Sequence, residues 1–151
     1  MKVTLEFDFK TFLRWLLAVV LVWAAVSKIA NLHEFFLNLL AYQLPLPEAL
    51  VRLVAMVLPW LELLCGGLLI AGKARRAALT WTAVLFVVFV LATGQAWARG
   101  LNISCGCFKL DFLGDGALAT FLESVKFAFF RAGLLLWAAV VLLRDAVRQD
   151  N

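Results

Sequence analysis

The chain has 151 residues, of which 65% are hydrophobic and 16% are charged. A globular domain carries roughly a quarter charged residues, so this composition excludes an ordinary soluble domain and indicates a protein embedded in lipid. The net charge of +4 does not indicate nucleic-acid binding, because the basic residues lie at the ends of apolar stretches and not in one patch.

Four apolar stretches account for nearly the whole chain. A helix needs about 20 mainly apolar residues to cross the hydrocarbon core of a bilayer. The sequence therefore predicts an all-α integral membrane four-helix bundle, a single transmembrane domain over residues 1–151, with spans at about 11–26, 49–72, 77–98 and 117–143. We do not expect a cleaved signal peptide, because no small-residue cleavage site follows the first apolar run.

A short interfacial helix is expected between the first and second spans, at residues 35–42. Pro45 and Pro47 follow it, and proline cannot continue helical hydrogen bonding. In the second and third spans, Gly67 and Gly94 are small enough to let neighbouring helices pack closely.

The distribution of lysine and arginine predicts the orientation, since cytoplasmic ends of spans are enriched in basic residues. Eight basic residues fall on the side of the two termini: Lys2, Lys10, Arg14, Lys73, Arg75, Arg76, Arg144 and Arg148. Five fall on the other side: Lys28, Arg52, Arg99, Lys109 and Lys126. Both termini are therefore expected in the cytoplasm, and the loop after the third span is expected outside.

That outer loop carries Cys105 and Cys107, which are separated by one glycine. Glycine reaches backbone conformations closed to other residues and lets two close cysteines turn towards each other. A disulfide between them would close a small, strained ring, and strained or exposed disulfides tend to be labile or catalytic. We predict that these two cysteines are catalytic and exchange thiol for disulfide.

Other interpretations of the cysteines remain open. The pair could simply staple the loop or stay as inert thiols. A soft-metal site with His33 is conceivable but has few ligands, so no metal is predicted. Cys65 lies roughly 24 Å below the outer end of its span, too deep to reach the loop, and is interpreted as a buried small hydrophobe.

Glu62 and Arg131 both fall near the middle of their predicted spans. An ionisable side chain at that depth is costly unless it is paired or faces a polar cavity. We expect these two residues to interact, directly or through water, either as an ion pair that gives the bundle its specificity or as part of a proton path or ligand site.

Several motifs in order resemble the MauE branch of the DoxX-like membrane proteins. They are Lys28 after the first span, Phe36 and Tyr42 before the proline-containing loop, Leu58-Pro59-Trp60-Leu61-Glu62 with Gly66-Gly67, and Arg99-Gly100 leading to Cys105-Gly106-Cys107-Phe108. The resemblance covers three of the four spans. It implies a four-helix bundle in a bacterial-type inner membrane.

In that family, the methylamine-utilisation member is associated with a periplasmic thioredoxin-like protein and with disulfide formation in a secreted dehydrogenase subunit. DoxX-type relatives are linked to quinone-coupled sulfur oxidation. The resemblance thus implies an oxidoreductase acting on thiols, with a thioredoxin-like partner and a membrane quinone as electron carrier. Tyr42, Trp97 and Phe108 are candidate quinone contacts, and Lys28, His33 and Arg99 are auxiliary candidates.

A second hypothesis is a non-catalytic accessory or assembly subunit of a larger membrane complex, in which the cysteine loop serves for docking. Passage of a small molecule or a metal through the bundle is disfavoured, because the spans carry few polar groups.

Overall fold

The computed structural model describes residues 2–101 and 124–149. Its helices are α1 (Lys2–Ala30), α2 (Leu32–Ala41), α3 (Glu48–Ala71), α4 (Arg75–Ala98) and α6 (Val125–Gln149). Four of them are long and apolar enough to cross a membrane, over Phe9–Ala30, Glu48–Ala71, Arg75–Ala98 and Val125–Gln149. The prediction of an all-α membrane bundle with a short helix after the first span is confirmed. The part of the expected fourth span before Ser124 lies outside the described residues.

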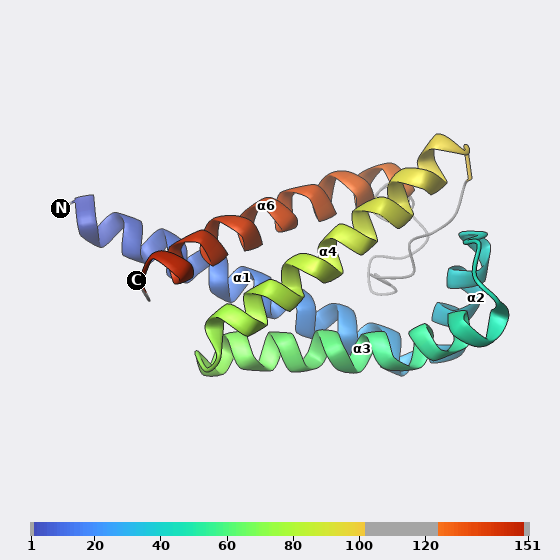
Figure 1. The fold of residues 1–151 in the computed structure, drawn as a ribbon, viewed down its shortest axis with the longest axis horizontal. Coiled ribbons are helices and arrows are strands. Elements are labelled where there is room, and N and C mark those ends of the chain that lie inside the picture. The colour runs from blue at the N-terminus through green and yellow to red at the C-terminus, as the bar shows by residue number, and fades with distance from the viewer. Residues whose placement is uncertain (1, 102–123, 150–151) are drawn as a thin grey trace, which may run out of the picture.

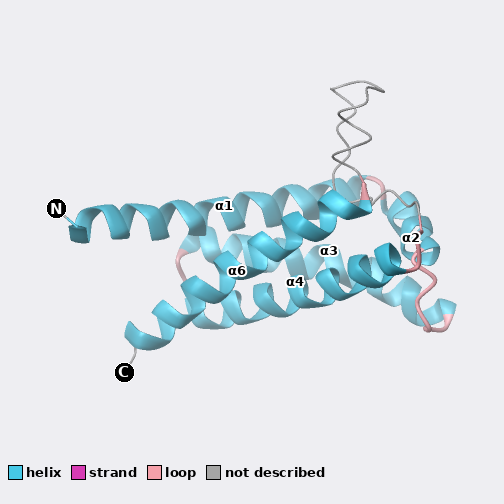
Figure 2. Ribbon diagram, turned by 90° about the horizontal axis from the view of Figure 1, so that it is seen from above, coloured by secondary structure: helices cyan, strands magenta, loops and turns pink. Residues whose placement is uncertain are grey.

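The long helices form two close pairs, α1 with α3 and α4 with α6, and the pairs meet through α3 with α4 and α1 with α6. Figures 1 and 2 show both chain termini at one end of the bundle, with the turn from α3 to α4 on the same side. We call this the terminal end. The opposite end, the loop end, carries α2, the connection to α3 and the last turn of α4 (Figure 1).

The turns between helices follow from local backbone chemistry. Asn31 alone separates α1 from α2, with φ −127° and ψ 51°. Pro47 is the N-cap of α3, as expected for a residue whose missing N–H is not needed there. Gly72 ends α3 in the left-handed conformation at φ 68°, which glycine adopts without a Cβ clash.

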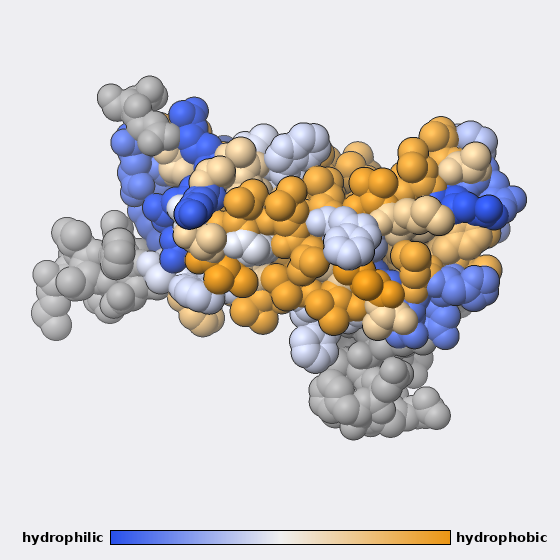
Figure 3. All heavy atoms as spheres, turned by 90° about the horizontal axis from the view of Figure 1, so that it is seen from below, coloured by the Kyte–Doolittle hydropathy of each residue, from blue (hydrophilic) through white to orange (hydrophobic). Residues whose placement is uncertain are grey.

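The distribution of side chains is that of a membrane protein. Many of the largest apolar side chains lie outside, including Trp60, Leu91 and Leu134. Many buried positions are small, such as Ala25 and Ala139, which are fully buried. In Figure 3 an apolar band crosses the middle of the molecule between hydrophilic ends. Small interior residues let helices approach closely, while large apolar ones face the lipid tails.

At Gly66, α3 packs closely on α1. A Cβ at Gly66 would lie 2.8 Å from Cγ2 of Val22 and 3.2 Å from the backbone oxygen of Ala18. Gly67, which the sequence analysis expected to pack closely, would have nothing within 4 Å of an added Cβ. Gly94 does pack closely, with Phe129 3.1 Å from its Cβ position. The contact between α1 and α3 therefore depends on Gly66 and not on its neighbour.

We predict that Gly66→Ala destabilises the bundle by about 1–3 kcal/mol, because an added methyl group must force α1 and α3 apart. The matched control is Gly67→Ala, which adds the same methyl group in open space and should be neutral or slightly stabilising, since alanine is the better helix former. Unfolding of both variants in detergent, followed by circular dichroism, measures the difference. Equal stability of the two variants would contradict this packing.

Candidate functional site

A buried ion pair lies between α1 and α3. The Lys28 ammonium donates to both carboxylate oxygens of Glu62, with Nζ–Oε distances of 2.6 and 2.7 Å. The side chains are 3% and 11% exposed, so solvent screens the attraction very little. Two charges removed from water in this way are tolerated only when each is closely paired. The pair therefore ties the register of α1 to that of α3.

The chain brings these two residues together for geometric reasons. α1 and α3 run in opposite directions (Figure 1), and their close approach at Gly66 lies one helical turn from Glu62. Side chains on a helix lean towards its N-terminus. Lys28, near the C-terminal end of α1, therefore reaches back into the bundle with its long apolar stem and meets the carboxylate.

The short helix α2 closes over the same point. The Lys28 ammonium lies 5.4 Å from the centroid of the Phe35 ring, and Phe35 is buried. A cation over an aromatic face is attracted to the ring, more strongly where water is excluded. Residues from α1, α2 and α3 thus converge on one charge.

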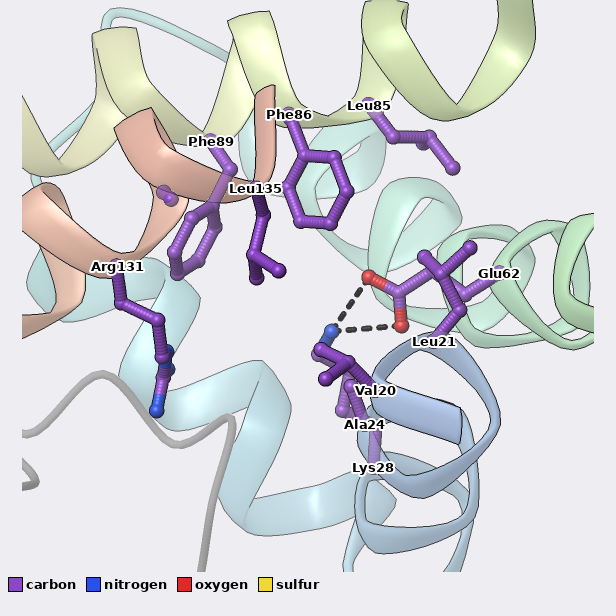
Figure 4. A pocket seen from close by; sticks show the side chains of 11 residues that line it. Val20, Leu21, Ala24, Lys28, Glu62, Leu85, Phe86, Phe89, Arg131 and Leu135 are labelled. Carbon is purple, nitrogen blue, oxygen red and sulfur yellow. Dashed lines mark hydrogen bonds and ion pairs between the residues drawn. The ribbon is translucent and has the colours of Figure 1, made fainter. Parts of the chain in front are cut away.

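A small cavity adjoins the ion pair. It is lined by residues of four helices, among them Ala24, Lys28, Glu62, Phe89 and Arg131. Its volume is about 40 Å³, which gives room for only about two or three water molecules. Figure 4 shows the pair at one side of this cavity and the Arg131 side chain at the other.

A direct pairing of Glu62 with Arg131, which the sequence analysis allowed, is wrong, because the carboxylate is bound by Lys28. Glu62 and Arg131 line the same cavity, so their interaction through water stays a prediction. The Arg131 guanidinium lies 5.9 Å from the centroid of the Phe127 ring. The reason is helix pairing, since α3 packs mainly on α1 while α6 packs mainly on α4.

A second polar cluster, at the loop end, fastens α4 to the connection between α2 and α3. Arg99 donates from Nη1 to the backbone oxygen of Gln43 at 3.1 Å and from Nη2 to its side-chain oxygen at 2.9 Å. Gln95 donates to the backbone oxygen of Tyr42 at 2.8 Å. Gln43 has φ 48°, a left-handed conformation that is uncommon for residues other than glycine. These bonds hold that turn in place.

The remaining candidate residues fall into three groups. His33 is exposed on α2. Cys105, Cys107 and Phe108 lie outside the described residues. The two other candidate quinone contacts have unlike surroundings. Tyr42 is buried in an apolar cluster with Ala96 and Val125, whereas Trp97 is 41% exposed.

The surroundings of Trp97 are aromatic. Its ring centroid lies 5.6 Å from that of Phe129 and 6.0 Å from that of Phe130, and Phe130 is exposed. A planar ring could stack on this surface, whereas the buried Tyr42 ring offers little face. The fit to a quinone is therefore better at Trp97 and its two phenylalanine neighbours than at Tyr42.

The helices and the buried pair define a multi-pass membrane protein with four long helices, two of which, α1 and α3, are joined near the loop end by a buried charge pair. The family model described as methylamine utilisation protein MauE matches residues 6–144. The chain belongs to the MauE family.

Curated relatives agree with this assignment. A methylamine utilization protein MauE from Methylorubrum extorquens is 41% identical over 100 residues, which are 66% of this chain and 53% of the relative. One from Methylophilus methylotrophus is 39% identical over 93 residues, 61% and 48% of the two chains. One from Paracoccus denitrificans is 37% identical over 99 residues, 64% and 52%. The matched part spans about half the length of these relatives, and no solved structure matches significantly.

We predict that either Lys28→Met or Glu62→Met alone destabilises the bundle by about 3–5 kcal/mol, because each leaves the charge of the other residue buried and unpaired. The double variant Lys28→Met/Glu62→Met should be clearly more stable than either single variant, since both charges are then removed. Unfolding in detergent measures all three.

The control for this prediction is Glu48→Gln, which breaks the exposed pair of Glu48 with Arg52 at 3.2 Å and should cost only about 0.3–0.5 kcal/mol. If the double variant lost as much free energy of unfolding as the two single variants together, Lys28 and Glu62 would not be energetically coupled.

Proposed function

We propose that this chain is a membrane accessory protein of methylamine utilisation that exchanges thiol for disulfide with a periplasmic thioredoxin-like partner through Cys105 and Cys107. The observation that carries the proposal is topological. The segment with the cysteines leaves α4 just after the Arg99–Gln43 contact and returns to the bundle at the start of α6. It therefore begins and ends at the end opposite both termini (Figure 1).

The charge distribution supports an outer position for this segment. Of the five basic residues counted at the loop end, Lys28 is buried and neutralised by Glu62, so it does not act as a surface topology signal. Eight basic residues at the terminal end then stand against four at the loop end. This larger difference supports cytoplasmic termini more strongly. An outer loop would face a compartment in which disulfides persist.

The chemistry follows from the residue types. The thiolate of one cysteine attacks the disulfide of the partner and forms a mixed disulfide, with one partner thiolate as the leaving group. The second cysteine then attacks the mixed disulfide. The partner leaves as a dithiol, and Cys105 and Cys107 become a disulfide that carries two electrons fewer. The reverse sequence oxidises the partner by the same steps.

A membrane quinone, when bound, would supply a two-electron carrier that couples this exchange to the membrane. The exposed rings of Trp97 and Phe130, with the half-buried ring of Phe129 in contact with both, support a contact surface for it. Their role is to bind a flat apolar ring near the loop end, in reach of the lipid phase.

A second candidate function is that of a non-catalytic assembly subunit. The cavity beside the ion pair favours it, because about 40 Å³ is too small for any organic cofactor. In that case the charge pair serves only to hold the bundle, and the cysteine segment serves to dock a larger complex.

Replacement of both loop cysteines by serine separates the two functions. We expect Cys105→Ser/Cys107→Ser to abolish turnover of the partner's disulfide while the protein still accumulates in the membrane, because serine keeps the size but cannot form a disulfide. The measurement is growth on methylamine of a bacterium that lacks its own MauE, together with mass analysis of the partner's thiols.

Cys65→Ala is the matched control, because Cys65 is a free, buried cysteine of α3 and its loss should leave turnover unchanged. Normal growth and normal partner thiols in the double serine variant would rule out electron transfer. Loss of the assembled complex in that variant would favour the assembly subunit instead.

A further inference from the structure

The terminal end of the bundle contains a second cavity, unrelated to the ion pair. It lies between α1, α3, α4 and α6 and has a volume of about 120 Å³. Its polar lining residues include Lys10, Arg14, Arg75 and Asp145. A more open hollow beside it shares Arg75 and Gln149, so the two form one recess around the start of α4. We call it the basic recess.

Among the residues with described side chains, 9–101 and 124–149, the charges of the basic recess do not balance. Lys10 pairs with Asp145 at 3.0 Å, which leaves Arg14 and Arg75 without an ion-pair partner among those residues. The Nε atom of Arg14 is buried and has no hydrogen-bond partner among those same residues. A buried donor without an acceptor is costly, and the planar guanidinium matches the geometry of phosphate oxygens.

The start of α4 adds a third attraction for an anion. Arg75 is its first residue, and the N-cap Ala74 makes no side-chain hydrogen bond to the helix. Backbone N–H groups and the helix dipole at such a terminus favour a negative charge. Two arginines and an uncapped helix start therefore face the same small volume.

The depth of the recess indicates where the anion comes from. Arg14 lies four residues beyond Lys10, a charged residue at the start of the apolar stretch of α1, roughly 6 Å further along by helical rise. Phe12, Trp15 and Trp81 are exposed on α1 and α4 near this level, as is usual for aromatic side chains at a membrane interface. A cation at this depth meets lipid headgroups, and basic pockets between membrane helices bind anionic ones.

We propose that the basic recess binds the phosphate of an anionic phospholipid, with Arg14 and Arg75 as its ligands and the acyl chains in the surrounding bilayer. The lipid joins α1, α4 and α6 across a part of the bundle where the only described ion pair is that of Lys10 with Asp145. This inference does not depend on the chemistry of the cysteines.

The test is a titration of the full chain in detergent, followed by native mass spectrometry, with phosphatidylglycerol, phosphatidylcholine and inorganic phosphate as separate probes. Phosphatidylglycerol should bind in preference to the zwitterionic lipid. Arg14→Gln and Arg75→Gln should each weaken it about fivefold, the ratio for one basic residue near an anionic lipid surface. Arg144→Gln, an exposed arginine of α6 outside the recess, is the matched control and should leave binding unchanged.

A fourth variant keeps all the basic side chains of the recess, so lost packing around an arginine cannot explain its effect. Asp145→Asn removes the one acidic group among the described lining residues of the recess and releases Lys10, so it should strengthen binding of phosphatidylglycerol. Equal binding of the two lipids, or equal loss in Arg14→Gln and Arg144→Gln, would overturn the proposal. Displacement of the lipid by millimolar inorganic phosphate would assign the recess to free phosphate and would also overturn it, as would weaker binding in Asp145→Asn.

Discussion

The contact between Lys28 and Glu62 constrains the rest of this structure. Neither charge is stable alone in a lipid-embedded interior, so the bundle must bring them together. α1 and α3 are held in one register by the pair, with the close approach at Gly66 one turn away. Phe35 of α2 closes over the same ammonium. A single salt bridge thus fixes the relative positions of three helices near the loop end.

The two ends of the bundle use polar residues differently. At the loop end, polar groups are paired with one another: Lys28 with Glu62, and Arg99 with Gln43. At the terminal end, Arg14 and Arg75 face a recess without an acidic partner among the described residues. At the loop end these contacts therefore join α1 to α3, and the end of α4 to the connection between α2 and α3. The terminal end is arranged to interact with the charged surface of the membrane.

The candidate site was only partly predictable. Glu62 stood out because a carboxylate in the middle of an apolar span needs a partner, and this requirement was correct. The identity of the partner was not, because Lys28 looked like an ordinary basic residue just past its span. The long side chain of Lys28 leans towards the N-terminus of α1 and carries the ammonium inward. The position of a residue along its predicted span does not take this length and direction into account. The family resemblance singled out Lys28 without giving it this role.

The sequence alone determined that the chain lies in a membrane, how many long helices it forms and, within about two residues, where α3 and α4 begin and end, since these depend on apolar length and on local signals such as Pro47 and Gly72. Only the tertiary structure decided which helices pair and therefore which side chains meet. Gly66 and Gly67 are identical residues in adjacent positions, yet only Gly66 faces α1. Adjacent residues point about 100° apart around a helix. Which of the two glycines lies in a helix–helix interface is decided only by the packing of the second helix.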